Sequence, residues 1–263
     1  MQVKVDGNKI HYEISGHGPW LTLSHPLACN LHVWDEQMPV LTAKFTVLRY
    51  DTRGHGDSAT PAGPYTLEQL AADARGLLDA LGIGRTHWVG LSMGSMVGQT
   101  VALRYPTLVQ TLTLAGATSH YPPQITAAFE QRIRDVTAGG TQAIAASTLE
   151  RWFTAPYREA HPQTMDRIGG YIRTTPVAGY AGCCHAISRI NLTDRLKEIK
   201  CPILVMVGAQ DPGTPVAMAR TIYQAVPGTE LIIVPSAAHL LNIEQPRAFN
   251  TSLLAFLSRA VAV

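Results

Sequence analysis

The sequence has few charged residues and no concentration of one sign. Asp, Glu, Lys and Arg make up 15% of its 263 residues, and 21 basic side chains stand against 19 acidic ones for a formal charge of +2. No basic run is longer than a pair. Proteins whose main partner is nucleic acid or an anionic membrane usually gather positive charge in a patch or run. We therefore expect neither kind of partner.

Cysteine is also scarce, and its placement excludes two common uses. Cys29, Cys183, Cys184 and Cys201 form no C-x-x-C pair, and their spacing is not that of a disulfide framework or a zinc site. No apolar run approaches the roughly 18 residues of a membrane span, and the N-terminus has no apolar core of signal-peptide length. The motifs H-E-x-x-H and G-x-G-x-x-G, which would indicate a metal or a dinucleotide, are missing. These absences predict a cytoplasmic protein without cofactor or metal.

Apolar residues, in contrast, make up 46% of the chain and fall into short runs. The runs that we predict as strands are residues 3–5, 9–15, 20–24, 45–50, 87–91, 112–115, 203–207 and 231–234. The first two flank Asp6-Gly7, which indicates a hairpin. Helical patterns such as residues 67–81 separate most of the others. The alternation predicts an α/β fold, with a mostly parallel eight-stranded sheet and helices on both of its faces.

The stretch from Ser119 to Arg195 interrupts this alternation. It contains no convincing strand, only helical patterns at residues 124–136, 141–151, 163–174 and 177–190. A block of helices between two strands indicates an insertion that lies on top of the sheet. We therefore predict a core of residues 1–118 and 196–263 and a helical cap of residues 119–195, inserted after the sixth strand. The cap holds seven aromatic residues, Trp152 among them, and we expect one or two to face a pocket.

The sequence GLSMG at residues 90–94 is the strongest functional signal. It follows a predicted strand directly and precedes a segment that can be helical as far as Tyr105. On such a sharp turn, side chains two residues before and after the serine would collide, and glycine removes them. The turn lifts the Ser92 hydroxyl above the carboxyl edge of the sheet, where open α/β sheets bind ligands. We predict Ser92 as a nucleophile.

A nucleophilic serine needs a base, and the base needs an acid that orients it. In this strand order the acid and then the histidine must follow the serine. The loop after the strand at residues 203–207 contains one acid, Asp211, and the loop after residues 231–234 contains one histidine, His239. We predict that Asp211 accepts the Nδ1 proton of His239 and that Nε2 takes the proton of Ser92.

The negative charge that develops on the substrate oxygen also requires donors. The Met93 N–H stands at the start of the predicted helix, where the amides are unpaired and the helix dipole favours an anion. For the second donor we assign the Leu27 N–H, in the loop after the strand at residues 20–24. Both groups are predicted to form the oxyanion hole.

Two other polar clusters resemble catalytic sites but are predicted to be structural. Asp51 and His55 lie in the segment DTRGHGDS, before the nucleophile, and so violate the required order. Cys183 and Cys184 precede His185 inside a helical pattern with no sharp turn beside them. A turn that packs beside the site explains the first cluster, and a pair facing the core explains the second.

These residues resemble the α/β-hydrolase superfamily over the full chain, and the similarity is closest to 3-oxoadipate enol-lactonases. The matching segments are residues 48–58 (LRYDTRGHGDS), 63–65 (GPY), 90–94 (GLSMG), 151–153 (RWF) and 238–246 (AHLLNIEQP). The resemblance implies the same triad of Ser92, Asp211 and His239. It also implies hydrolysis of the enol-lactone that arises in the degradation of aromatic compounds.

The enol-lactone bears a carboxylate, so the resemblance implies a cation near the pocket. The cap has no lysine but several arginines, including Arg132, Arg134, Arg151 and Arg173. We assign Trp152 as a substrate-binding residue. Three other uses of the same triad stay open: hydrolysis of other small carboxylic esters, hydrolysis of a carbon–carbon bond, and slow turnover in a small-molecule receptor.

Overall fold

The computed structural model describes residues 1–261, and its centre is one eight-stranded sheet in the order β1-β2-β4-β3-β5-β6-β7-β8. The strands are β1 Gln2–Val5, β2 Asn8–Gly16, β3 Trp20–Ser24, β4 Thr46–Tyr50, β5 Thr86–Leu91, β6 Val109–Ala115, β7 Ile203–Gly208 and β8 Glu230–Val234. β2 pairs antiparallel with β1 and β4, and the other five pairings are parallel. The prediction of a mostly parallel sheet of eight strands is confirmed.

The hairpin of β1 and β2 turns at the two residues that predicted it. Val5 lies opposite Asn8, so that Asp6 and Gly7 alone form the connection. Both have positive φ angles, 45° and 80°. A two-residue turn of this kind matches the twist of the two strands and favours Asp-Gly.

The central strands are covered on both faces. Every residue of β5 and of β7 is buried, which explains why their sequences are apolar without alternation. β8, at the edge of the sheet, is more open, and its Ile233 is 37% exposed. The loops that follow β5 and β7 therefore start from strands that are buried along their whole length.

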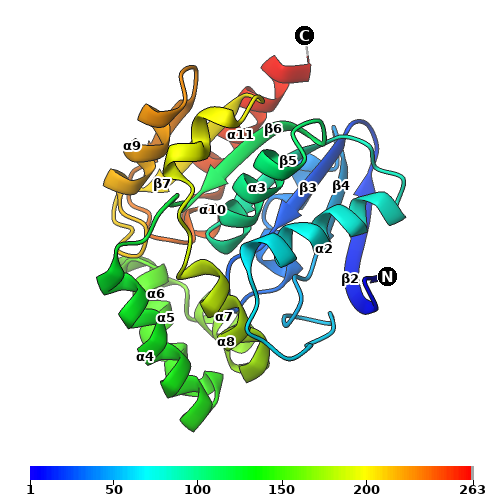
Figure 1. The fold of residues 1–263 in the computed structure, drawn as a ribbon. Helices are drawn as coiled ribbons and strands as arrows, with labels where there is room; N and C mark the ends of the chain where they lie inside the picture. Colours follow the sequence, from blue (N-terminus) through cyan, green and yellow to red (C-terminus); the bar gives the residue numbers. More distant parts are fainter. Residues whose placement is uncertain (262–263) are drawn as a thin grey trace.

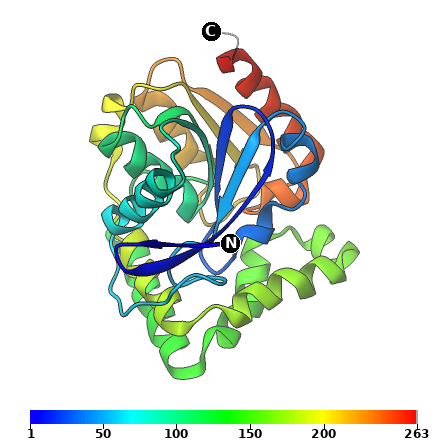
Figure 2. The same ribbon diagram turned by 90° about the vertical axis from the view of Figure 1, so that its right-hand side faces the viewer.

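Helices cover the two faces of the sheet. α2 (Leu67–Ala80) and α3 (Met93–Arg104) lie on one face, and α11 (Pro246–Val261) lies on the other (Figures 1 and 2). α2 begins at a capping box, in which the Thr66 side chain accepts from the Gln69 N–H and the Gln69 side chain accepts from the Thr66 N–H. Shorter elements of the same layers are the 3-10 helices η1 (Leu31–Trp34) and η3 (Thr193–Glu198) and the α-helices α1 (Met38–Leu41), α9 (Val216–Ala225) and α10 (Leu241–Glu244).

Most of the chain between β6 and β7, residues 123–187, is helical and gathers at one end of the sheet (Figure 1). Its elements are α4 Pro123–Gly139, η2 Thr141–Ile144, α5 Ala145–Trp152, α6 Ala155–Ala160, α7 Pro162–Thr174 and α8 Val177–Ile187. We call the segment from α4 to α8 the helical segment. The assignment of residues 119–195 to a cap and of residues 1–118 and 196–263 to a core stays a prediction.

Within this segment the expected helices differ from the observed ones in three places. The helix expected at residues 141–151 begins as the 3-10 helix η2, and α6 has no counterpart among the expected helices. α8 ends at Ile187 rather than at residue 190, because the chain then forms an isolated antiparallel bridge between Asn191 and His120 on its way to β7. In the part of the chain that the structure describes, no helix has both the length and the apolar composition to cross a bilayer.

Candidate active site

Ser92 occupies the sharp turn between β5 and α3. Its φ of 53° and ψ of −112° lie outside the regions that residues other than glycine usually adopt. A Cβ at Gly90 would collide with the backbone of Gly94, and a Cβ at Gly94 would collide with the carbonyl of Ser24 in β3. The two glycines therefore let the turn close on itself and pack against the neighbouring strand, and the second of these contacts is one that the pattern alone does not reveal.

Asp211 and His239 lie in the loops after β7 and β8, and their side chains are joined. His239 Nδ1 and Asp211 Oδ2 are 2.7 Å apart, and both side chains are buried. Asp211 also accepts hydrogen bonds from the Gly213 N–H at 2.8 Å, from the Thr214 N–H at 3.0 Å and from the Thr214 hydroxyl at 2.7 Å. Because a carboxylate can only accept, the shared proton sits on Nδ1, which leaves Nε2 of the neutral ring free to accept a proton.

The charge of Asp211 is stabilised where it lies. Burial alone would raise the pKa of the Asp211 carboxyl, but the His239 ring and the hydrogen bonds from His239 and Thr214 outweigh burial and hold this pKa below its ordinary value. The His239 ring itself packs against Gly116 at the end of β6, where a Cβ would come within 3.3 Å of it. An ionised Asp211 and a small neighbour at residue 116 together fix the orientation of the imidazole.

Ser92 and His239 both line one cavity of about 140 Å³. This is close to the roughly 150 Å³ of a cavity that accommodates a single benzene ring. No hydrogen bond joins the Ser92 hydroxyl to the His239 ring within residues 1–261. Such contacts are often long until a substrate is bound. The structure thus brings Ser92 and His239 to one cavity, and Asp211 bonds the far side of the His239 ring without lining the cavity itself.

The two predicted oxyanion donors stand beside the same serine. Leu27 lines the cavity, and Met93 is the first residue of α3, directly after Ser92. Both residues are buried, and neither N–H has a backbone acceptor in the described chain. Buried N–H groups are nearly always paired, so two unpaired ones at a cavity are available to a ligand oxygen.

Trp152 also lies at the cavity, where four aromatic residues of segment 119–195 stand rather than the one or two expected from the sequence. It is the last residue of α5, and its ring centroid is 6.3 Å from that of His239. Other aromatic side chains of the wall are Tyr121, Phe129 and Tyr180. The ring next to the imidazole therefore belongs to the helical segment, whereas the imidazole belongs to the sheet edge.

Arg132 and Arg151 are the two cationic residues at the cavity, and the sequence did not show which arginines face inward. Arg151 donates to the Thr148 hydroxyl at 3.0 Å, and Arg132 lies over the Phe129 ring at 4.9 Å. Neither forms an ion pair within residues 1–261. Burial, and then the like charge of Arg132, lowers the pKa of Arg151. Two unpaired guanidinium groups that repel each other form a site for an anion.

Glu244 joins the helical segment to the histidine loop, and sequence reasoning assigned it no role. Its Oε2 accepts from the Ala238 N–H at 2.7 Å, next to His239. Its Oε1 accepts from the Thr154 N–H at 2.8 Å and the Thr154 hydroxyl at 2.5 Å, two residues after Trp152. Its only sequence signal is its place in the segment AHLLNIEQP. One buried carboxylate therefore fixes the imidazole loop against the end of α5.

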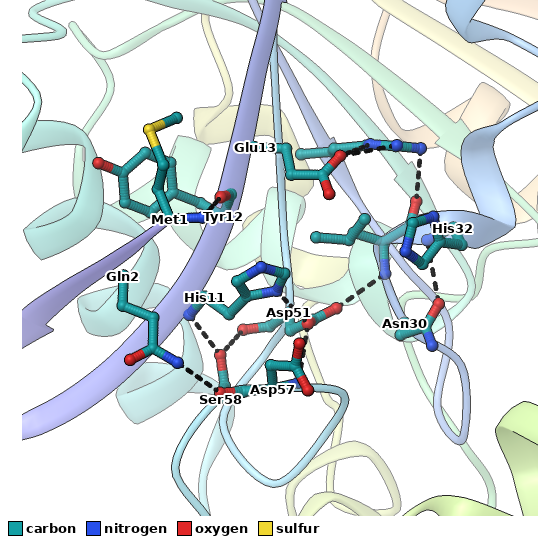
Figure 3. A network of polar contacts seen from close by, with 12 residues as sticks. Met1, Gln2, His11, Tyr12, Glu13, Asn30, His32, Asp51, Asp57 and Ser58 are labelled. Carbon is teal, nitrogen blue, oxygen red and sulfur yellow. Dashed lines mark hydrogen bonds and ion pairs between the residues drawn. The ribbon is translucent and has the colours of Figure 1, made fainter.

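The cluster at Asp51 is structural in its contacts, as expected. Asp51 Oδ1 accepts from the Leu31 N–H at 2.8 Å, and Oδ2 accepts from the Asp57 N–H at 3.0 Å and lies 2.8 Å from His11 Nδ1 (Figure 3). The nearby Ser58 hydroxyl donates to the Asp51 carbonyl and accepts from the His11 N–H. The Ser58 hydroxyl thus bonds backbone groups and not the His11 imidazole, so Ser58, His11 and Asp51 form no second triad.

The Cys183 and Cys184 pair is likewise apart from the cavity. Both lie in α8 and are buried, and burial raises the pKa of the Cys184 thiol to about 12. A thiol that stays protonated is a poor nucleophile. Within residues 1–261 no group of three or more His, Cys, Asp or Glu side chains has an arrangement that could hold a metal ion.

Comparison with known proteins agrees with this geometry. The family model described as alpha/beta hydrolase fold matches residues 19–246. A 3-oxoadipate enol-lactonase 2 from Acinetobacter baylyi is 34% identical over 92% of this chain and 89% of its own length. A protein from Caulobacter sp. (strain K31), named as a proposed carbamate hydrolase, RutD, is 30% identical over 98% of each chain.

A solved structure is similar over nearly the whole chain. The enol-lactonase from Burkholderia xenovorans LB400 superimposes with a TM-score of 0.93 at 36% identity, covering 98% of this chain and 100% of its own. The family match, these relatives and the sheet with its helices all agree. The chain belongs to the α/β-hydrolase fold family, is similar to 3-oxoadipate enol-lactonases, and is a hydrolase of the kind that acts on esters and lactones.

Proposed function

We propose that the protein opens a small lactone ring through an acyl-enzyme on Ser92, and that its substrate is 3-oxoadipate enol-lactone. The observation that supports this most is the cavity of about 140 Å³, in which Ser92 and His239 stand beside two unpaired arginines. It has room for a small ring and offers cations to a carboxylate. The similarity to proteins named enol-lactonases supports the same substrate.

The first half of the proposed reaction opens the ring. The Ser92 oxygen attacks the lactone carbonyl while His239 Nε2 takes the hydroxyl proton, and the Asp211 carboxylate stabilises the imidazolium that forms. The carbonyl oxygen, now negative, lies between the Leu27 and Met93 N–H groups. When the intermediate collapses, the bond between the carbonyl carbon and the ring oxygen breaks. That oxygen leaves as an enol with the proton from His239.

The second half releases the product. His239 removes a proton from water, which attacks the ester that now joins the opened chain to Ser92. The bond to Ser92 breaks, and the serine oxygen regains its proton from the imidazolium. The products are a free carboxylate and an enol that tautomerises to the ketone, so that one water molecule is consumed for each ring opened.

Arg132 and Arg151 are the residues that would select a carboxylate-bearing substrate. A carboxylate on the substrate would neutralise the repulsion between the two guanidinium groups and accept their hydrogen bonds. A neutral ester of the same size would leave both guanidinium groups without a countercharge. We therefore propose that the pocket prefers a lactone that bears a carboxylate over uncharged esters, and that the enzyme works in the cytoplasm.

A kinetic panel tests this function. The rates are compared for the enol-lactone, for its neutral methyl ester, for a simple acetate ester and for a small carbamate, the last because of the relative RutD. The expected kcat/KM is highest for the enol-lactone, above about 10⁴ M⁻¹s⁻¹, and lower for its methyl ester. A carbamate or an acyclic ester that outruns the enol-lactone would overturn the proposed substrate.

A further inference from the structure

Two buried histidines join the loop after β3 to the loop after β4 in a reciprocal way. His25, in the first loop, accepts at Nε2 from the Thr52 N–H of the second loop at 2.9 Å. His55, in the second loop, accepts at Nε2 from the Ala28 N–H of the first at 3.0 Å. Both rings are wholly buried, and their centroids are 5.2 Å apart. We call these two side chains the histidine clasp.

The other nitrogen of each ring fixes its tautomer. His25 Nδ1 lies 2.7 Å from the Pro26 carbonyl, and His55 Nδ1 lies 3.3 Å from the Arg53 carbonyl. A carbonyl can only accept, so both rings have their proton on Nδ1 and a lone pair on Nε2. Burial, followed by the neighbouring His25 ring, lowers the pKa of His55 to about 3, and burial lowers that of His25 although Asp51 opposes it. Both pKa shifts favour the neutral rings that the two accepted hydrogen bonds require.

The clasp holds both peptide groups that flank the Leu27 side chain. The Pro26 carbonyl and the Leu27 N–H belong to one planar trans peptide group, so a hydrogen bond to this carbonyl directs the N–H away from the His25 ring. The next peptide group donates the Ala28 N–H to His55. Ala28 has a φ of 59°, a left-handed conformation that residues other than glycine adopt only when their surroundings impose it.

Beyond Ala28 the same loop is held a third time. The Leu31 N–H donates to Asp51 Oδ1 at 2.8 Å, and Asp51 is itself fixed by His11 and by the Asp57 N–H (Figure 3). The loop after β4 thus holds the loop after β3 by side chains at residues 51 and 55. The Pro26 carbonyl also accepts from the Cys29 N–H at 3.3 Å, whereas within residues 1–261 the N–H and the carbonyl of Leu27 have no hydrogen-bond partner.

We propose that His25 and His55 are positioning residues for the oxyanion hole, which hold the Leu27 N–H in the direction that a developing oxyanion requires. The inference rests on the proposed function, because it takes Leu27 as an oxyanion donor. His55, in the segment DTRGHGDS, thus acts on the reaction only indirectly. Neither ring touches the substrate, and each acts through a peptide group.

The test compares three variants in the full-length protein. His55→Leu removes the acceptor, His55→Gln keeps an acceptor near the position of Nε2, and His87→Leu is the control. His87 is also wholly buried, but it lies in β5 and bonds the Thr111 hydroxyl at 2.9 Å. Each variant is measured for kcat, for KM, and for its affinity for propylboronic acid, which forms a tetrahedral adduct on a nucleophilic serine.

For His55→Leu the expected kcat falls roughly tenfold to a hundredfold, less than the loss of an oxyanion donor itself. Its KM stays within about twofold, because the donor acts mainly in the transition state. Boronic acid affinity falls by a factor similar to that of kcat. His55→Gln recovers most of the kcat and most of the boronic acid affinity, and a folded His87→Leu keeps its kcat. An unchanged kcat in folded His55→Leu, or an equal loss in His87→Leu, would overturn the proposal.

Two further measurements separate the possible failures. Nitrogen NMR of the wild-type protein reports the tautomers without any substitution. It should show His25 and His55 protonated at Nδ1 alone from pH 5 to pH 8, and a ring that titrates in this range would contradict the clasp. Ser92→Ala tests the function itself. If it stays active, the proposed function fails; if it is inactive while His55→Leu is fully active, only the clasp fails.

Discussion

The sheet edge and the helical segment contribute to the cavity in different ways. At the edge, Ser92, Asp211 and His239 each follow a parallel strand, and Asp211 is held by hydrogen bonds from His239, Gly213 and Thr214. The helical segment supplies apolar rings and two arginines, and Arg132 has no ion-pair partner within residues 1–261. The sheet edge fixes the positions of a few atoms, whereas the helical segment lines the space in which a ligand can bind.

Several polar contacts join the two regions, among them the Tyr65 N–H to the Gly182 carbonyl at 3.2 Å and Arg167 to Glu36 at 3.8 Å, and two of them hold the loop of His239. The Leu240 N–H donates to the Trp152 carbonyl at 3.1 Å, and Glu244 joins Thr154 to the Ala238 N–H. We infer that the reaction class is fixed at the edge, whereas the choice of substrate is made by the helical segment.

The largest effect is expected at the sheet edge. Ser92→Ala should lower kcat by about 10⁵–10⁶, as removal of a triad nucleophile does elsewhere. The melting temperature should change little, because the side chain loses only a hydroxyl in a half-open position. Steady-state kinetics and thermal unfolding check both parts. A variant that keeps more than about one part in a hundred of the activity would contradict the role of Ser92.

The next effect is expected in the helical segment and should depend on the substrate. Arg151→Met should raise KM for the carboxylate-bearing lactone about tenfold to a hundredfold, the worth of a hydrogen-bonded charge pair, and leave KM for its neutral methyl ester nearly unchanged. Arg134→Met is the matched control, because Arg134 is exposed and bonds only Gln131. Equal losses for both substrates would show that Arg151 acts in packing and not in recognition.

A smaller effect is expected where the two regions join. Glu244→Gln keeps the shape of the side chain but sets an NH₂ group against the N–H of either Ala238 or Thr154, which we expect to cost about 2–3 kcal/mol in the free energy of unfolding. Urea denaturation measures it. Glu230→Gln is the control, since its ion pair with Arg259 is exposed and should contribute less than about 1 kcal/mol. Equal destabilisation in the two variants would contradict the role of Glu244 in joining the helical segment to the loop of His239.

The smallest effect concerns acid stability at the edge. The folded protein holds His55 neutral down to about pH 3, whereas the unfolded chain protonates this ring near pH 6.5. Between these values the unfolded state binds more protons, so stability falls as the pH is lowered from about 6.5 toward 3. At pH 5 the free energy of unfolding should have fallen by about 2 kcal/mol through His55 alone. In His55→Gln the fall in unfolding free energy between pH 7 and pH 5 should be smaller by that amount, and an unchanged pH dependence would contradict the buried neutral ring.

The comparison of regions also explains how much the sequence could predict. The positions of Ser92, Asp211 and His239 follow from the order of strands and loops, because the carboxyl ends of parallel strands meet at one edge. The choice of Arg132 and Arg151 among the arginines did not follow, because it depends on how α4 and α5 are rotated when they pack. The succession of strands and loops can be recognised from short stretches of sequence, whereas the rotation of a helix depends on residues far away in the chain.

The histidine clasp shows the same limit at the edge itself. Sequence order predicts that His55 lies outside the triad. The bonds from His55 to the Ala28 N–H and from His25 to the Thr52 N–H join backbone groups to side chains 27 residues away, with no pattern that links them. Such contacts become visible only when two loops are seen side by side.

The most direct test of the account is a titration with a fluorophosphonate, which reacts with activated serines. Hydrolysis of the enol-lactone is followed while the label bound per chain is counted by mass spectrometry. The account predicts that activity falls in proportion to labelling, reaches zero at one label per chain, and that this label is on Ser92. A fully labelled protein that still opens the lactone at its original rate, or a label that abolishes activity from another residue, would contradict it.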